Sequence, residues 1–101
     1  MPGVCRDGDA TTTGHGCDTT TTVTRPSTDV FCNSLGVERK GDFTVSHDRP
    51  VGDPVVCTAH TSSITEGSAK KVFVNSKLIA RITDDCDAGE ITGGSTNVFA
   101  G

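Results

Sequence analysis

The chain has 101 residues, a formal net charge of −4 at pH 7 and only 33% hydrophobic residues. This length predicts a single domain covering residues 1–101. The acidic balance argues against a nucleic-acid partner and against attraction to anionic lipid, because both need a basic face. With four Phe, no Trp and no Tyr, the core is expected to be thin, so the fold needs another source of stability.

Local composition indicates an all-β fold. Twelve Gly and four Pro interrupt the chain, and Val and Thr dominate between them, which favours short strands and turns over helices. No apolar run reaches the roughly 20 residues of a membrane span, and the N-terminal MPGVCRDGD lacks the regions of a signal peptide. We therefore expect synthesis in the cytoplasm, with the five cysteines reduced rather than joined in a full disulfide framework.

A repeated segment occurs three times along the chain. Residues 27–42 read STDVFCNSLGVERKGD, residues 68–85 read SAKKVFVNSKLIARITDD, and residues 95–101 read STNVFAG. In the first two copies Asn-Ser separates two β-rich runs, and Asn tolerates the left-handed conformation that a two-residue hairpin turn demands. Each of these copies is predicted to form a hairpin, and the third to supply a single strand. The predicted opposing pairs are Val30 with Val37, Phe31 with Gly36, Val72 with Ile79, and Phe73 with Leu78.

Three loops accompany the repeats and carry the unusual residues. They run over residues 8–22, 41–68 and 84–95. Because each loop belongs to a similar unit, the sequence predicts a small body with approximate threefold internal symmetry.

These loops also carry the residues suited to metal binding. His15 lies in the first loop, His47 and His60 in the second, and Cys86 in the third, which has no histidine. Three imidazoles and one thiolate make a tetrahedral set for zinc, and a site closed by four protein ligands is structural rather than catalytic. Iron would accept the same donors. Such an ion would stabilise a domain with a thin core, and the glycines flanking His15 would let the backbone bend closely around it.

The other cysteines leave the fourth ligand open. Cys57 is the main alternative, because it forms a C-x-x-H with the histidine three residues later. Cys17 would have to share a very tight turn with the preceding histidine. Cys32 falls on a predicted strand and is interpreted as a small buried hydrophobe, and Cys5 gives no signal either way.

Common enzyme motifs do not occur in the sequence. There is no H-E-x-x-H, no H-x-E with a downstream C-x-x-C, no G-x-S-x-G and no Gly-rich phosphate loop. Although Asp18, Asp48 or Glu66 could be recruited as a base, we expect the protein not to be an enzyme.

The order of motifs resembles that of the PAAR-repeat proteins. It runs from GD and HG through VFCN, C-x-x-H, ITEGS, VFVN, LIAR and a D-D-C turn to ITGGSTNVF at the C-terminus. The resemblance covers nearly the whole chain and is most specific over residues 57–101. The chain departs from the family pattern at Asn-Ser in place of Asn-Gly, twice, and at an insertion over residues 43–56.

The resemblance implies a conical β-structured cap on the trimeric β-helical spike of a contractile phage tail or type VI secretion system, with one tip monomer per trimer. Similar proteins hold zinc near the apex with three His and one Cys, which carries over to His15, His47, His60 and Cys86. The tip would be made in the cytoplasm, sit at the end of the virion tail or secretion apparatus, and help to puncture the target cell envelope.

The resemblance also implies where the spike would bind. Three similar strands would cover the three unpaired strand edges at the end of a trimer. The predicted partner-binding residues are Val30, Phe31, Val72, Phe73, Val98 and Phe99. No toxin extension is expected. Two other classes stay open: a free-standing metal-binding or redox-sensing module, and a disulfide-bonded secreted domain.

Overall fold

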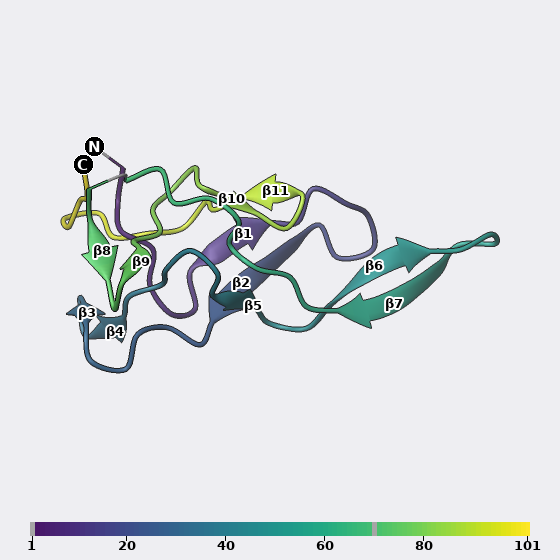
Figure 1. The fold of residues 1–101 in the computed structure, drawn as a ribbon. Coiled ribbons are helices and arrows are strands. Elements are labelled where there is room, and N and C mark those ends of the chain that lie inside the picture. Colours follow the sequence, from purple (N-terminus) through teal and green to yellow (C-terminus); the bar gives the residue numbers. More distant parts are fainter. Residues whose placement is uncertain (1, 70) are drawn as a thin grey trace.

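The computed structural model describes residues 2–69 and 71–101 and is all-β, as the composition predicts (Figure 1). The strands are β1 (Ala10–Thr12), β2 (Thr20–Thr24), β3 (Phe31–Cys32), β4 (Leu35–Gly36), β5 (Phe43–Thr44), β6 (His47–Val51), β7 (Val56–His60), β8 (Phe73–Val74), β9 (Lys77–Leu78), β10 (Asp85–Cys86) and β11 (Gly89–Glu90). The described residues form no helix, and hence none with the length and apolar character of a membrane span.

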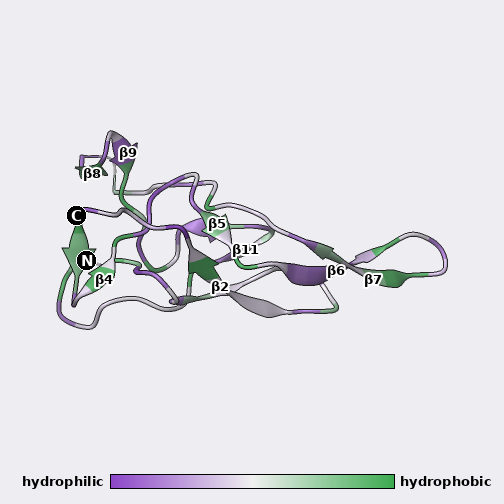
Figure 2. Ribbon diagram, turned by 90° about the horizontal axis from the view of Figure 1, so that it is seen from below, coloured by the Kyte–Doolittle hydropathy of each residue, from purple (hydrophilic) through white to green (hydrophobic). Residues whose placement is uncertain are grey.

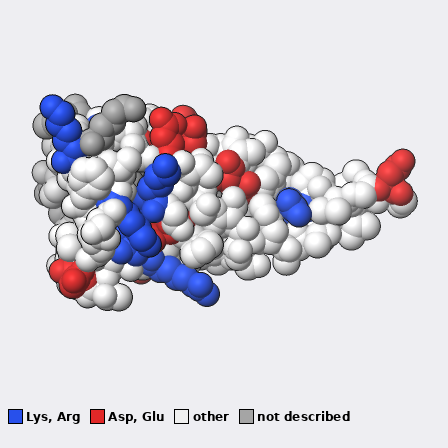
Figure 3. All heavy atoms as spheres, viewed as in Figure 1, with Lys and Arg blue, Asp and Glu red and all other residues white. Residues whose placement is uncertain are grey.

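The molecule is elongated, with extents of 44 × 23 × 23 Å. The β6–β7 hairpin projects at one end, here called the hairpin end (Figure 1). Both chain termini lie at the opposite end, beside the β3–β4 and β8–β9 hairpins, and this is called the terminal end. On the face drawn in Figure 3, most Lys and Arg side chains lie over the terminal half, whereas the hairpin end shows few charged groups.

All of the strand pairs are antiparallel and short. β1, β2 and β5 form a three-stranded sheet with β2 in the middle, and the remaining strands pair as the hairpins β3–β4, β6–β7, β8–β9 and β10–β11. Isolated bridges join these small sheets, for example from Thr11 to Ile91 and from Ile64 to Cys86. Side chains from several sheets must therefore be buried together to form a core.

The two Asn-Ser turns have the conformation that the sequence predicts. Asn33 and Ser34 have φ values of 53° and 66°, and Asn75 and Ser76 have values of 53° and 67°. Positive φ at both central residues is typical of the type I′ turn, which matches the twist of the flanking strands. The predicted register is confirmed: Phe31 pairs with Gly36 and Phe73 with Leu78, while the amides of Val37 and Ile79 donate to the carbonyls of Val30 and Val72.

Replacing Ser34 or Ser76 by glycine is expected to stabilise the protein by roughly 0.5 kcal/mol per turn. A left-handed conformation costs a residue with a Cβ about 1 kcal/mol, and glycine avoids this cost but loses more chain entropy on folding. Chemical denaturation would measure the change. Ser46→Gly is the control, because Ser46 is exposed and is not among the residues with positive φ. A loss of stability in the turn variants equal to that of the control would contradict the expectation.

Three segments that are distant in sequence close a ring of backbone hydrogen bonds. The amide of Cys5 donates to the carbonyl of Ala80, that of Ala80 to Glu38, and that of Glu38 to Cys5, each at 3.0 Å. All three residues have an exposed fraction of 0%. The ring therefore joins the N-terminal segment to the ends of both Asn-Ser hairpin repeats.

An arginine follows each residue of the ring and contacts an aspartate three positions later. The pairs are Arg6 with Asp9, Arg39 with Asp42 and Arg81 with Asp84. In each pair the arginine amide donates to the aspartate side chain at 2.8–3.0 Å. In the first two pairs the guanidinium also contacts both carboxylate oxygens, whereas in the third the hydroxyl of Ser68 joins the two side chains. The three segments thus repeat the same local interactions.

The core consists of two buried clusters. The first contains Val4, Cys32, Val37, Ala69, Val74, Ile79 and Ala100, and the second contains Cys5, Val23, Ile64, Ala80, Cys86 and Ile91. Cys32 is 6% exposed, which confirms its interpretation as a small buried hydrophobe. Glu38 is also fully buried, and among the described residues neither of its carboxylate oxygens has a hydrogen-bond partner.

The structure corrects the predicted middle loop, which contains the longest hairpin of the protein. β6 and β7 pair over five rows, from His47 opposite His60 to Val51 opposite Val56. Pro50 lies within β6, and a proline inside a strand weakens the sequence signal for pairing. Figure 2 shows hydrophobic stretches (green) on this hairpin as well as in the body. The first predicted loop likewise contains β1 and part of β2.

Candidate metal centre

His15 is presented by the loop between β1 and β2. The loop packs closely on the turn between β10 and β11, because a Cβ at Gly14 would lie 2.0 Å from the carbonyl oxygen of Ala88. Gly14 also has a φ of 74°. Glycine at this position therefore lets the two turns touch and places Asp87 beside His15. A Cβ at Gly16 would meet open space. Of the two glycines that flank His15, packing therefore requires only Gly14 to lack a side chain.

His47 and His60 lie opposite each other at the base of the β6–β7 hairpin. His47 is 5% exposed, and its Nδ1 lies 2.9 Å from the carbonyl of Val45. The Nδ1 of His15 lies 2.9 Å from the carbonyl of Gly16. Because a carbonyl only accepts, both Nδ1 atoms carry hydrogen, and both Nε2 atoms are left to face the centre of the cluster.

Asp87 brings a carboxylate to the same point. It lies in the β10–β11 turn with a φ of 55°. Its Oδ2 is 2.8 Å from Nε2 of His47, 2.9 Å from Nε2 of His15 and 3.4 Å from Nε2 of His60. The Nε2 atoms of His15 and His60 are 3.1 Å apart. One donor atom from each of the four residues therefore lies within 4.8 Å of all the others.

This donor set fits a metal ion. The neutral imidazoles of His15 and His47 direct lone pairs at a carboxylate, and this convergence is unfavourable unless a proton or a cation lies between the donors. Three imidazole nitrogens and one carboxylate oxygen can fill a tetrahedral zinc site. Iron accepts the same ligands, so the donor set does not by itself identify the metal.

The pKa values of His15, His60 and Asp87 are shifted by their contacts with one another and by burial. The pKa of His15 is raised, first by its bond to the carbonyl of Gly16 and then by Asp87, against the opposing effect of burial. Burial, which disfavours the charged ring, lowers the pKa of His60. Burial opposes ionisation of Asp87, but the neighbouring imidazoles of His47 and His15 lower its pKa on balance. Acidification should therefore weaken metal binding, because protons and metal compete for the same nitrogens.

The fourth donor beside the histidines is Asp87, whereas the sequence predicts Cys86. Cys86 is fully buried in the second core cluster, and burial raises the pKa of its thiol, so the thiolate needed for metal binding is disfavoured. Asp87 follows the strand in the β10–β11 turn, where its left-handed conformation (φ 55°) and the close packing of Gly14 on Ala88 place its carboxylate beside the histidines. A signal was present in the sequence, since Asp87 falls in a turn next to the predicted cysteine.

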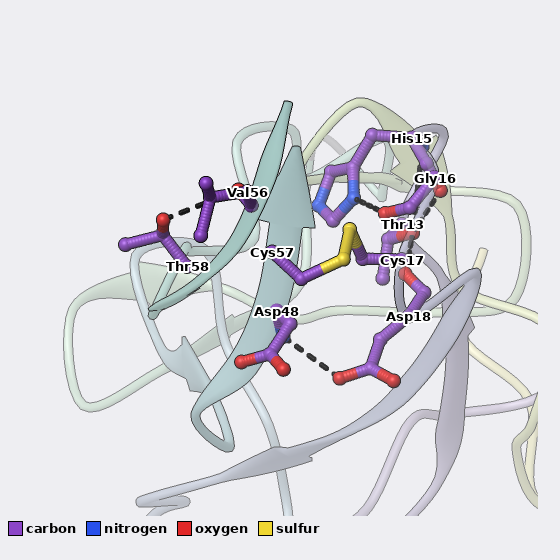
Figure 4. The surroundings of a disulfide bond; sticks show 9 residues. All are labelled: Thr13, His15, Gly16, Cys17, Asp18, Asp48, Val56, Cys57 and Thr58. Atoms are coloured by element: carbon purple, nitrogen blue, oxygen red, sulfur yellow. Dashed lines mark hydrogen bonds between the residues drawn. A yellow bond between two sulfur atoms is a disulfide. The ribbon is translucent and has the colours of Figure 1, made fainter. Parts of the chain in front are cut away.

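A disulfide joins Cys17 to Cys57 beside the histidines (Figure 4). This bond corrects the expectation of five reduced thiols, although Cys5, Cys32 and Cys86 are free and buried. It also removes the alternative in which Cys57 is the fourth ligand, because a disulfide sulfur is not a thiolate. The pair was missed because its residues are 40 positions apart, and only the β6–β7 hairpin brings Cys57 to the first loop.

The predicted partner-binding residues are mostly exposed. Phe31, Phe73 and Phe99 are 62%, 60% and 49% exposed, and the β3–β4 and β8–β9 hairpins that carry the first two lie at the terminal end (Figure 1). The exposed fractions of Val30 and Val98 are 37% and 39%, whereas Val72 packs against the first core cluster.

No protein-family model matches the chain, and no curated protein matches its sequence.

Proposed function

We propose that this protein is a metal-stabilised tip of the PAAR type, which caps the distal end of a trimeric β-helical spike. One observation carries the proposal. The N-terminal segment and the ends of the two Asn-Ser hairpin repeats each have an arginine–aspartate contact and meet in a closed ring of hydrogen bonds. Three segments with the same local contacts support approximate threefold symmetry, with which a monomer would cover three equivalent strand edges.

The terminal end is proposed as the surface that faces the spike. Each of the three repeats places one exposed phenylalanine on the surface: Phe31, Phe73 and Phe99. Exposed aromatic side chains in a patch are typical of protein interfaces. The end of a trimeric β-helix offers unpaired strands and apolar side chains. Its three chains match the three phenylalanines in number, and its apolar side chains match them in chemistry.

The metal centre is proposed to have a structural role, in which the ion links the body of the protein to the β6–β7 hairpin. It holds together the β1–β2 loop, the base of the β6–β7 hairpin and the β10–β11 turn. With four protein ligands the ion has no open position for a substrate, so its contribution is stability rather than catalysis. We propose zinc as the resident ion, with iron as the alternative.

The narrow hairpin end would then lead a conical body. In a virion tail or a secretion apparatus this end would meet the target cell envelope first during puncture, after synthesis in the cytoplasm and assembly on the spike. The covalent and metal links at the hairpin base would resist unfolding under that load.

Phe73→Glu is expected to abolish capping without unfolding the protein, because Phe73 is 60% exposed and the charge would be placed in the apolar contact. Binding to a purified trimeric β-helical spike would be followed by analytical ultracentrifugation, with one chain expected per trimer. Val55→Glu is the matched control, because Val55 is 66% exposed but lies at the turn of the β6–β7 hairpin. Equal binding by wild type and Phe73→Glu, or loss of binding only in Val55→Glu, would overturn the proposed surface.

A free-standing metal-binding or redox-sensing module is the second candidate. The exposed disulfide next to the histidines favours it. Wild-type protein that binds metal but does not associate with the spike would support this candidate over the tip.

A further inference from the structure

The Cys17–Cys57 disulfide connects two of the three elements that supply metal donors. Cys17 lies two residues after His15 in the β1–β2 loop, and Cys57 lies on β7, three residues before His60. The Nε2 atoms of these two histidines are 3.1 Å apart. The covalent bond and this histidine contact therefore join the same two segments.

Few other contacts hold the His15 loop against the hairpin. Residues 16–20 are all exposed, so little buried surface fixes this part of the loop. The amide of Asp18 donates to the carbonyl of Asp48 at 3.1 Å, and the amide of Asp48 donates to the Asp18 carboxylate at 2.7 Å (Figure 4). Exposed hydrogen bonds of this kind contribute little net stability, because water competes for the same groups.

Both cysteines of the pair are themselves exposed. Their exposure favours attack on this bond by a soluble thiol, whereas the three free cysteines are buried. Exposed disulfides are typically the reducible ones, and structural disulfides are typically shielded.

We infer that the Cys17–Cys57 pair is a redox modification site that sets how tightly His15, His47, His60 and Asp87 hold a metal ion. The oxidised pair keeps His15 next to His60, so the four donors are preorganised. In the reduced pair the exposed part of this loop, residues 16–20, loses its covalent link to the hairpin, so that metal binding must first fix the position of His15 relative to His60. This inference rests on the metal centre of the proposed function and is independent of spike capping.

The step uses a dithiol as reductant and leaves the oxidation state of the metal unchanged. A thiolate of the dithiol attacks one sulfur of the pair and forms a mixed disulfide, and the second cysteine leaves as a thiolate and is protonated. The second thiol of the reductant then attacks the mixed disulfide and releases the other cysteine. Two electrons and two protons pass to the protein, and the dithiol becomes a disulfide.

Thermodynamic linkage adds a reciprocal consequence. If reduction weakens metal binding by a given factor, bound metal must make the disulfide harder to reduce by the same factor. We expect a factor of about ten, which for a two-electron couple lowers the reduction potential of the pair by about 30 mV. A protein assembled in a reducing cytoplasm would then tighten its metal centre after reaching an oxidising medium.

The test compares zinc affinity in the two redox states of the intact chain. Zinc would be titrated against a competing chromophoric chelator, with oxidised wild type, wild type reduced by a phosphine that binds zinc weakly, and the Cys17→Ser/Cys57→Ser double variant. We expect the dissociation constant to rise about tenfold on reduction and to be equally raised in the double variant. Reductant should not change the affinity of the double variant, which controls for effects on the buried thiols. Circular dichroism would confirm that each form is folded.

The outcomes separate the inference from the metal centre. Equal affinity in both redox states, or tighter binding after reduction because the new thiols become ligands, would overturn the redox inference and leave the metal centre intact. Oxidised wild type that binds no zinc and no ferrous iron would overturn the metal centre and with it this inference. A dithiol titration of the disulfide with and without zinc gives the second readout, and an unchanged midpoint would also overturn it.

Discussion

Asp87→Ala is expected to remove the metal ion from the purified protein, whereas Cys86→Ala is expected to retain about one ion per chain. Oδ2 of Asp87 lies 2.8–3.4 Å from the Nε2 atoms of all three histidines, while Cys86 is buried in the core. The two residues are adjacent in sequence and receive the same substitution, so each variant is a matched control for the other. Elemental analysis after gel filtration would measure the metal content.

The two variants should also differ in how a chelator changes their thermal stability. A bound ion stabilises the folded state by about 4 kcal/mol when its free concentration is a thousand times the dissociation constant. Chelation should therefore lower the unfolding temperature of wild type and of Cys86→Ala, and leave Asp87→Ala unchanged. Cys86→Ala itself should cost about 1–2 kcal/mol through lost packing. Loss of metal in Cys86→Ala with retention in Asp87→Ala would restore the cysteine as the fourth ligand.

The free energy of unfolding is expected to fall as the pH rises from about 4.5 to about 9, because Glu38 binds a proton more tightly in the folded state. Burial raises the pKa of Glu38 from 4.5 to about 9, and the carboxylates of Asp42, Asp7 and Asp9 act in the same direction, whereas Arg39 opposes them. Between these two pH values the folded state holds the additional proton. Stability is therefore greatest below the unfolded pKa and is lost as the pH approaches the folded pKa, by at most about 1.4 kcal/mol per pH unit.

Glu38→Gln should flatten this dependence, because glutamine does not titrate and resembles the protonated carboxyl in shape. The free energy of unfolding would be measured by chemical denaturation at several pH values from 5 to 9. Other titrating groups, including the histidines, affect wild type and variant alike, so the difference between the two curves reports on Glu38. Glu90→Gln at the exposed Glu90 is the control and should keep the slope of wild type. Parallel curves for wild type and Glu38→Gln would contradict the prediction.

Local sequence was sufficient for the all-β class and for the Asn-Ser hairpins. A type I′ turn depends on the φ values of two adjacent residues, and asparagine at 33 and 75 tolerates the positive values observed. Once a two-residue loop is present, the register of its strands follows without any distant contact. Local sequence did not predict the β6–β7 hairpin. Its pairing extends through a proline, and its turn was interpreted as part of a longer loop.

Composition alone also singled out the three histidines as candidate metal donors, because few other residues in a chain of this kind have that chemistry. Their convergence, and the choice of Asp87 over its neighbour Cys86, depends on the conformation of the β10–β11 turn and on the packing of Gly14 against Ala88. The Cys17–Cys57 bond and the burial of Glu38 depend on segments 30 or more residues apart meeting in space. Short-range conformational preference therefore determined the turns and strands, whereas the ligand set, the disulfide and the buried carboxyl were decided by tertiary contacts that no local pattern encodes.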